Sequence, residues 1–213
     1  MIARRIARLG CVVAVALATV LATTLPASAT GKTAKGTDSL ASVLAADGSG
    51  FDRNWNDFDI VDNAVTAVLG AKPDSAVAVL ADGSVALTAF LPTDRAFRKL
   101  AKDLTGKTYK TEAQVFGALA STLGIDTIEN VLLYHVVPGA TVTYRQALKS
   151  NGAVLNTALP GASVKVKVVW YYLVSLKDND PDASNPYVVK ANLNKGNLQI
   201  AHGINRVLRP VDL

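Results

Sequence analysis

Apolar residues in the first two thirds of the chain recur at the spacing of amphipathic helices. After Asp59, for example, Ile, Val and Ala repeat every three to four positions until Gly70, which predicts one helix over this stretch. Before it, Phe51, Trp55 and Phe58 stand in a polar stretch, and we expect their rings to pin an irregular segment. Helices are predicted over 39–46, 59–70, 93–105, 111–123, 126–137 and 144–149.

The period of the pattern changes to two after residue 151. Three valines between 164 and 168 alternate with Lys165 and Lys167, which predicts a strand with one buried and one wet face. Earlier, apolar runs on both sides of Asp82-Gly83 predict a hairpin, because glycine tolerates a positive φ. Helices followed by strands predict an α+β fold. Strands are predicted over 77–80, 85–91, 164–168, 170–176, 187–193 and 198–208.

The first 29 residues have the three parts of a secretory signal peptide. Three arginines precede an apolar run over 11–25, and Ala27-Ser28-Ala29 supplies small residues for cleavage. The run is shorter than the ~20 residues that span a membrane, which disfavours a retained anchor. Cys11 precedes the run instead of following it, which disfavours a lipoprotein. We therefore expect a secreted protein, at the cell envelope or cell wall, with no integral membrane anchor after cleavage.

Cleavage after Ala29 would leave a flexible lead over 30–38 and a single domain over 39–213. The three arginines and the only cysteine leave with the signal peptide, so 19 basic and 17 acidic side chains remain and no disulfide can form. A nearly neutral chain offers little support for nucleic-acid binding. The fold must be held by its core alone, and a chain of this length can bury most of its surface.

Three segments contain polar residues that the hydrophobic period does not explain. In each, these residues stand next to an apolar strand or at the end of a helix. The segments are 87–97 with Pro92-Thr93-Asp94, 132–139 with Tyr134-His135, and 200–210 with His202 and Asn205.

In order and spacing, these segments resemble the three shared motifs of the fasciclin domain family, over roughly 39–213. Leu91 replaces the usual Ala, and Asn205 stands where the family prefers Asp. The resemblance, to a secreted bacterial fasciclin-like protein, implies two β-sheets in a wedge or sandwich with helices packed alongside. It also implies cell adhesion or extracellular protein contact, without catalysis and without a cofactor. How Asn205 ties the motifs together stays open, since an amide lacks the charge of Asp.

The polar motif residues have a functional and a structural interpretation. For Tyr134 and His135, the resemblance implies recognition of a partner such as a cell-surface protein. Their apolar neighbours instead favour packing and a buried hydrogen bond. We expect His135 to bond near Asn205 or Thr93. Thr93 and Asp94 are predicted to cap the helix that follows their strand.

A catalytic site is not predicted. His135 and His202 could join a serine in a hydrolase constellation, but the chain has no Gly-x-Ser-x-Gly elbow. His202 alternates with apolar neighbours along a predicted strand, so we interpret it as structural, like Pro92 and Asn205. An exported hydrolase is the least favoured function.

Aromatic residues are densest at Trp170-Tyr171-Tyr172. Alternation along a strand would turn one or two of these rings outward, where they can contact a protein partner or stack on sugars. Cover for the core or the sheet edge is the simpler interpretation. Lys165, Lys167 and other lysines could contact anionic cell-wall polymers or serve solvation only. A cell-wall polysaccharide-binding protein is therefore the alternative to an adhesion module.

No metal site is predicted. Asp178, Asp180 and Asp182 place acids at alternate positions, as in a calcium-binding loop. Ala183 and Val189, however, stand where such a loop has glycine and glutamate, which favours a solvated turn. Whether these acids bind calcium stays open at this point.

Overall fold

A computed structural model describes residues 34–46, 48 and 50–213 of the chain. The predicted signal peptide and the first residues of the predicted lead lie outside this described part. Contacts among residues 34–213 hold them in one unit. The division into 1–29, 30–38 and 39–213 stays a prediction.

The described helices are α1 (Leu40–Ala45), α2 (Asp59–Ala71), the 3₁₀ helix η1 (Ala76–Ala81), α3 (Asp94–Thr105), α4 (Glu112–Tyr134) and α5 (Tyr144–Ala147). Several begin at a side-chain cap that the sequence supplies. Ser39 accepts a hydrogen bond from Ser42 N before α1, and Thr111 accepts one from Gln114 N before α4. Gly106 ends α3 with a left-handed φ of 71°. These local signals explain why most of the predicted helices are present.

Helix α4 is broken at Gly124, whose backbone (φ 72°, ψ 166°) is not helical. The break separates the two helices that the sequence predicts after Thr111 and Asp126, and so confirms them as separate pieces. By length and composition, α4 would be long and apolar enough to cross a membrane. Buried residues on both pieces, such as Leu119 and Val131, belong to the hydrophobic core, so one face of α4 packs into the domain.

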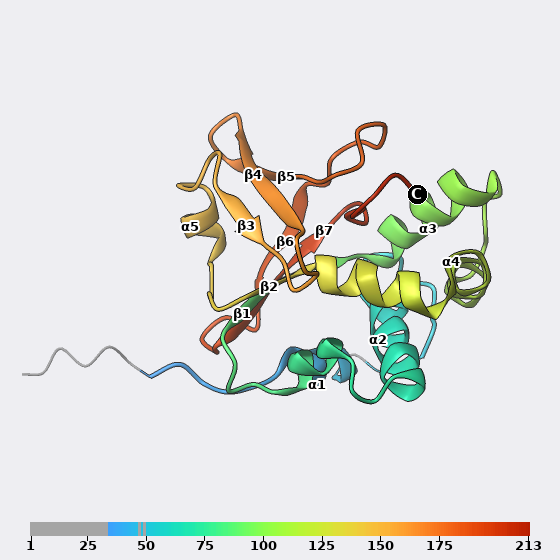
Figure 1. Cartoon of the computed structure of the whole chain (residues 1–213), viewed down its shortest axis with the longest axis horizontal. Coiled ribbons are helices and arrows are strands. Elements are labelled where there is room, and N and C mark those ends of the chain that lie inside the picture. The colour runs from blue at the N-terminus through green and yellow to red at the C-terminus, as the bar shows by residue number, and fades with distance from the viewer. Residues whose placement is uncertain (1–33, 47, 49) are drawn as a thin grey trace, which may run out of the picture. The chain divides into compact units, whose positions relative to one another are not determined.

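The strands are β1 (Leu87–Pro92), β2 (Val136–Pro138), β3 (Val154–Asn156), β4 (Ser163–Val169), β5 (Leu173–Lys177), β6 (Val188–Leu193) and β7 (Gln199–Ile204). They form two sheets in the described part of the chain (Figure 1). The four-stranded sheet has the order β2-β1-β7-β6, and its central pair, β1 and β7, is parallel. The three-stranded sheet, β3-β4-β5, is antiparallel.

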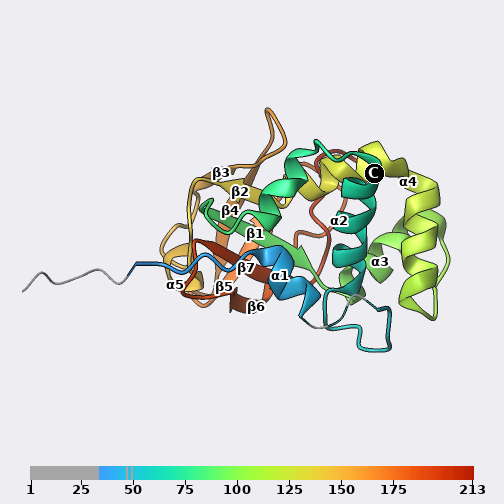
Figure 2. The same ribbon diagram turned by 90° about the horizontal axis from the view of Figure 1, so that it is seen from below.

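The four-stranded sheet separates two hydrophobic cores. Leu87, Ala89 and Leu91 of β1 pack with residues of α1 to α4, whereas Phe90 packs with residues of the three-stranded sheet. Strand β1 is buried along its whole length, which explains its nearly uninterrupted apolar sequence. Figures 1 and 2 show α2, α3 and α4 gathered on one side of the strands. The predicted α+β fold, two sheets with helices alongside, is confirmed.

The predicted hairpin around Asp82-Gly83 is wrong, because residues 76–81 form η1 instead of a strand. Gln199 of β7 is fully buried, and its side-chain amide donates to Val79 O at 2.8 Å and to Asp82 O at 2.7 Å. These bonds satisfy carbonyl groups of η1 and of the turn after it. A residue distant in sequence therefore decides the local structure.

Gly83 is needed for close packing and not for a positive φ. A Cβ at Gly83 would lie 1.7 Å from Thr37 O, whereas a Cβ at Gly70, on the exposed side of α2, would meet nothing within 4 Å. We expect Gly83→Ala to lower the free energy of unfolding by about 1–3 kcal/mol, because backbone must shift. Gly70→Ala is the matched control and should be neutral or stabilising by up to about 1 kcal/mol. Urea unfolding measures both, and equal stability of the two variants would contradict the contact.

Candidate functional site

The three sequence motifs converge on the central pair of parallel strands. Leu87 pairs with Gln199, and the register continues to Pro92 with Ile204, so the first motif lies beside the third. Strand β2, which follows directly after His135, pairs antiparallel with β1. Beyond the strands, Thr93 N donates to Ile204 O at 3.1 Å. The motifs therefore form one continuous part of the fold.

His135 connects all three motifs in the interior. Its backbone carbonyl accepts a hydrogen bond from Phe90 N at 2.9 Å. Its ring Nδ1 lies 2.6 Å from Val131 O, and its Nε2 accepts from Leu208 N at 2.9 Å. Because Nε2 faces a donor and Nδ1 faces a carbonyl, the proton is on Nδ1 and the ring is neutral. Both ring nitrogens are thus engaged with backbone groups.

Tyr134 and His135 are both buried. Tyr134 is completely inaccessible, and its hydroxyl donates to Ser163 O at 2.9 Å, which links α4 to the three-stranded sheet. The ring of His135 bonds to Leu208 of the third motif, and not to Asn205 or Thr93 as expected. Direct partner contact by these two rings would require the fold to open.

Asp94 caps a helix, but not the helix that the sequence predicts. It is the first residue of α3 and is completely buried. Its carboxylate accepts hydrogen bonds from Ile60 N at 2.8 Å and Asp59 N at 3.3 Å, at the start of α2. Thr93 has the N-cap position of α3, but its side chain makes no capping hydrogen bond. A contact between helices therefore replaces the predicted local cap.

His202 and Asn205 also satisfy backbone groups of neighbouring segments. His202 Nδ1 accepts from Asn192 N at 3.2 Å, and its Nε2 lies 2.9 Å from Val142 O. Asn205 Oδ1 accepts from Tyr187 N at 2.7 Å. An amide oxygen is a sufficient acceptor for this bond, so the position does not need the negative charge of Asp.

Trp170, Tyr171 and Tyr172 form an exposed turn between β4 and β5, and not the strand that the sequence predicts. Their exposed fractions are 70%, 96% and 65%, so the interpretation as core or sheet-edge cover is wrong. Trp170 and Tyr171 have positive φ angles of 49° and 65°, which bulky residues rarely adopt. The hydroxyl of Tyr144 donates to Tyr172 O at 2.8 Å and anchors this aromatic turn to α5.

A polar pocket beside the end of β4 gathers three cationic side chains, those of Lys99, Lys167 and Arg206. We call it the basic pocket. Burial and the nearby charges of Arg206 and Arg95 lower the pKa of Lys99, so positive charge is in excess here. Val169 also lines the pocket, and the aromatic turn follows it directly in the chain.

The acidic loop over 178–182 binds an arginine. Asp178 accepts a hydrogen bond from Arg209 N at 3.0 Å, and Asp180 pairs with Arg209 Nη1 at 3.2 Å. Arg209 Nη2 also pairs with Asp103 at 2.7 Å. Asp178 and Asp180 are buried, so the expectation of a solvated turn is wrong for both, and only Asp182 of the three acids is exposed. The guanidinium supplies the positive charge that a cation would bring.

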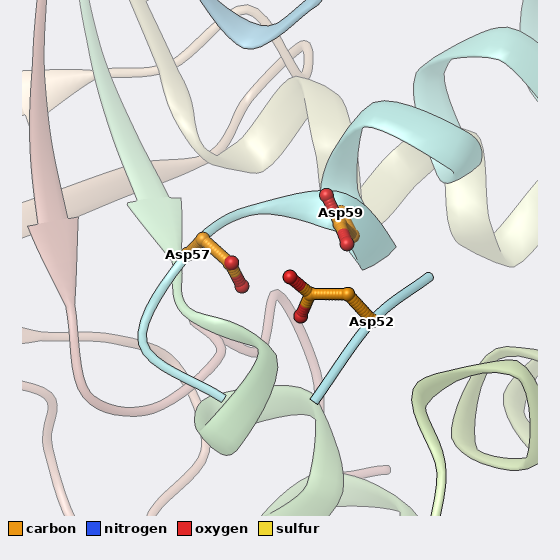
Figure 3. A group of neighbouring side chains, drawn as sticks. All are labelled: Asp52, Asp57 and Asp59. Atoms are coloured by element: carbon orange, nitrogen blue, oxygen red, sulfur yellow. The ribbon is translucent and has the colours of Figure 1, made fainter. Parts of the chain in front are cut away.

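A second group of acids, which the sequence analysis did not single out, lies where three helices begin. Asp59, Asp94 and Glu112 are the first residues of α2, α3 and α4, and Asp52 and Asp57 precede α2. Carboxylate oxygens of Asp52, Asp57 and Asp59 lie within 4.8 Å of one another (Figure 3), as do those of Asp57, Asp94 and Glu112. We call these five residues the carboxylate cluster.

Burial controls the charge of the carboxylate cluster. Burial raises the pKa of Asp94 to about 8, and a hydrogen bond between protonated Asp94 and Asp57 raises it as well. Burial also raises the pKa of Glu112. With oxygen donors alone, these are the described residues best suited to hold a hard metal ion.

Comparison with known proteins gives one family. A model of the fasciclin domain matches residues 64–210. Among solved structures, a FAS1 domain pair from the insect cell adhesion molecule fasciclin I is 16% identical, with a TM-score of 0.49. The match covers 72% of this chain and 48% of that one, so this chain spans about half the length of the insect structure. No curated protein matches the sequence.

The neutral, buried state of His135 predicts a pH dependence. Burial lowers the pKa of His135 from 6.5 to about 4. Protonation of Nε2 would also remove the acceptor of the Leu208 N–H. Below pH 6.5 the unfolded chain takes up the proton first. The stabilisation by the neutral ring is therefore complete above pH 6.5 and is lost as the pH falls to 4, by on the order of 3 kcal/mol.

The difference in unfolding free energy between the wild type and His135→Gln isolates this effect, because contributions of other acids cancel. We expect this difference to shrink between pH 6.5 and 4. Proton NMR of the chain's two histidines gives the pKa of His135 directly. A His135 signal that titrates near pH 6.5 would contradict the buried neutral ring.

Proposed function

The chain belongs to the fasciclin domain family, and from this premise we propose that it is a secreted, non-catalytic adhesion module that binds a protein at the cell surface or in the extracellular matrix. Fasciclin domains are typically adhesion or extracellular interaction modules, and they are generally not catalytic. The predicted signal peptide fits this function. Since the motif residues are largely buried, the binding surface must come from other parts of the chain.

The exposed aromatic turn is the observation that supports this function most strongly. Three adjacent rings at the surface are rare, and Trp and Tyr are the residues that most often dominate a protein interface. Positive φ angles at Trp170 and Tyr171 cost free energy that packing inside the protein does not recover. The hydrogen bond from Tyr144 fixes the turn, which lowers the entropy lost on binding.

Lysines on the two strands that the aromatic turn connects indicate the charge of the partner. Lys165, Lys167 and Lys177 are exposed on β4 and β5, and Lys165 stands directly opposite Lys177. Like charges in opposite positions destabilise a sheet, so this arrangement does not serve stability. We infer a partner surface that offers carboxylates around an apolar pocket for the rings.

A cell-wall polymer with anionic groups is the second candidate. The basic pocket would bind its charged groups, and the rings of the aromatic turn would stack on its sugars. A hydrolase finds no support, because both nitrogens of His135 and of His202 are engaged with backbone groups. Neither histidine is therefore available as a general base in this fold.

Removing the rings tests the binding surface. We expect Trp170→Ser combined with Tyr171→Ser to weaken binding of the purified protein to cells of its source by more than about tenfold, as loss of hot-spot residues does. The unfolding free energy of the double variant should not fall, since both side chains are exposed. Val189→Ser, which removes an exposed apolar residue of β6, is the matched control and should bind normally.

Treatment of the cells identifies the class of partner in the same assay. Loss of binding after surface proteolysis supports a protein, whereas loss after removal of cell-wall polymers supports the second candidate. If the double variant binds untreated cells as well as the wild type does, the aromatic turn has no role in binding, whichever class of partner the treatments indicate.

Charge reversal tests the predicted acidity of the partner. We expect Lys167→Glu to weaken binding and to reduce its dependence on salt, because Lys167 lines the basic pocket beside the aromatic turn. Lys195→Glu makes the same charge change at an exposed position of the turn between β6 and β7, and should have little effect. Binding assays at low and high ionic strength measure both variants. Equal losses for the two would indicate a general charge effect and contradict a specific basic contact.

A further inference from the structure

The carboxylate cluster buries negative charge that the fold does not balance. Asp57, Asp59, Asp94 and Glu112 are all buried, and only Asp52 is exposed. An ionised carboxylate in the interior is costly unless it is paired, hydrogen-bonded or bound to a metal. The cluster therefore needs a source of positive charge or of protons.

Positive charge within the described residues is insufficient. Asp52, Asp57, Asp94 and Glu112 form no ion pair with any described lysine or arginine. The N-termini of α2, α3 and α4 begin at the cluster, and each supplies roughly half an elementary charge. Together they offset about 1.5 of the up to four negative charges on these residues, and a divalent cation would offset most of the remainder.

Two buried oxygens of the cluster have no hydrogen-bond partner. Glu112 Oε2 accepts from Asp52 N at 2.7 Å, but Glu112 Oε1 is without a partner among the described residues, although the side chain is completely buried. Asp57 Oδ1 is likewise buried and has no hydrogen-bond partner among the described residues. Buried polar atoms are almost always satisfied in native proteins, so these two acceptors require an explanation. Both carboxylates belong to the group whose oxygens lie within 4.8 Å of one another.

We propose that the carboxylate cluster is a binding site for one calcium ion, centred on Asp57. The Asp57 carboxylate belongs to both groups of oxygens, and Figure 3 shows it turned toward Asp52 and Asp59. Glu112 Oε1 and Asp57 Oδ1 are the first ligands, and Asp52, Asp59 and Asp94 supply further oxygens. Asp52 is the exposed member of the cluster and connects it to solvent.

Ligand type and spacing select calcium. Carboxylate oxygens suit hard cations, and calcium accepts six to eight of them in flexible geometry. Two oxygens on opposite sides of a calcium ion, each about 2.4 Å from it, are about 4.8 Å apart. The carboxylate oxygens of each group lie within 4.8 Å of one another, so they can surround one calcium ion. Magnesium requires a tighter octahedron, with ligands at about 2.1 Å, and retains several waters. Convergence of several protein carboxylates therefore favours calcium.

Titration of calcium into chelator-treated protein tests the site, followed by calorimetry and by the midpoint of thermal unfolding. We expect saturable binding of one ion with Kd no weaker than roughly 10⁻⁴–10⁻³ M, the range of extracellular calcium modules, and a rise in Tm. Asp57→Asn and Glu112→Gln should each weaken binding by more than about tenfold. Glu112→Gln keeps an amide oxygen to accept from Asp52 N, so this variant should fold. Asp182→Asn removes an exposed acid of the other acidic loop and should bind calcium normally.

Terbium luminescence locates the ion. Terbium takes the place of calcium and is excited through a nearby tryptophan. Trp55 lies between Asp52 and Asp57 in the sequence, whereas Trp170 is on the aromatic turn. We expect Trp55→Phe to abolish the sensitised emission and Trp170→Phe to retain it.

Several results would overturn the proposal. One is that millimolar calcium gives no heat of binding in calorimetry and no shift in Tm, although circular dichroism shows that the protein is folded. Another is equal calcium affinity in the wild type and Glu112→Gln, or terbium emission that depends on Trp170. A response to magnesium without a response to calcium would refute the choice of ion. If Asp57→Asn does not fold, the wild-type titration and the two tryptophan variants still test whether the carboxylate cluster binds calcium.

Discussion

The parallel pairing of β1 with β7 is the contact on which the rest of the structure depends. It joins the first motif to the last, from Leu87 with Gln199 to Pro92 with Ile204, and closes a loop that contains most of the domain. Closing such a loop costs entropy, which burial on both faces of the pair offsets. Helices cover one face and the three-stranded sheet covers the other, so neither core is complete without this pair. His135 then fixes the second motif against β1 and against Leu208, which follows β7 in the chain.

This arrangement separates the scaffold from the surface that can act. The polar groups of the motif residues form hydrogen bonds with backbone groups inside the fold, as those of His135, His202 and Asn205 do. The aromatic turn lies outside the motifs, and four of the five residues of the carboxylate cluster do so as well, since only Asp94 belongs to a motif. Partner preference can therefore change through these segments while the scaffold stays the same. The cluster also ties the segment before α2 to α3 and α4, so an ion bound there would act on the packing of the helices.

Local pattern was enough to predict most of the scaffold. The α+β class, the capped helices and the alternating strand β4 follow from short-range signals, and the family follows from three motifs. Contacts between distant segments decided the local structures that the pattern did not predict. Gln199 turns a strand-like run into η1, and Asp94 caps α2 instead of its own helix. Strands β2 and β3 have three residues each, too few for a period.

The candidate sites were harder to predict than the scaffold. The aromatic turn carries no Gly or Asn, so the alternating pattern continues through it, and Trp170 and Tyr171 take the left-handed conformation themselves. For the carboxylate cluster, acids at three predicted helix starts were the available signal, but which helices meet is a property of the tertiary fold. Native-state hydrogen exchange tests the central pairing most directly. The amides of Phe90, Thr93 and Leu208, which join the three motifs, should exchange only through global unfolding. Exchange of Phe90 through a smaller opening that leaves Leu208 protected would contradict a scaffold held by one shared set of contacts.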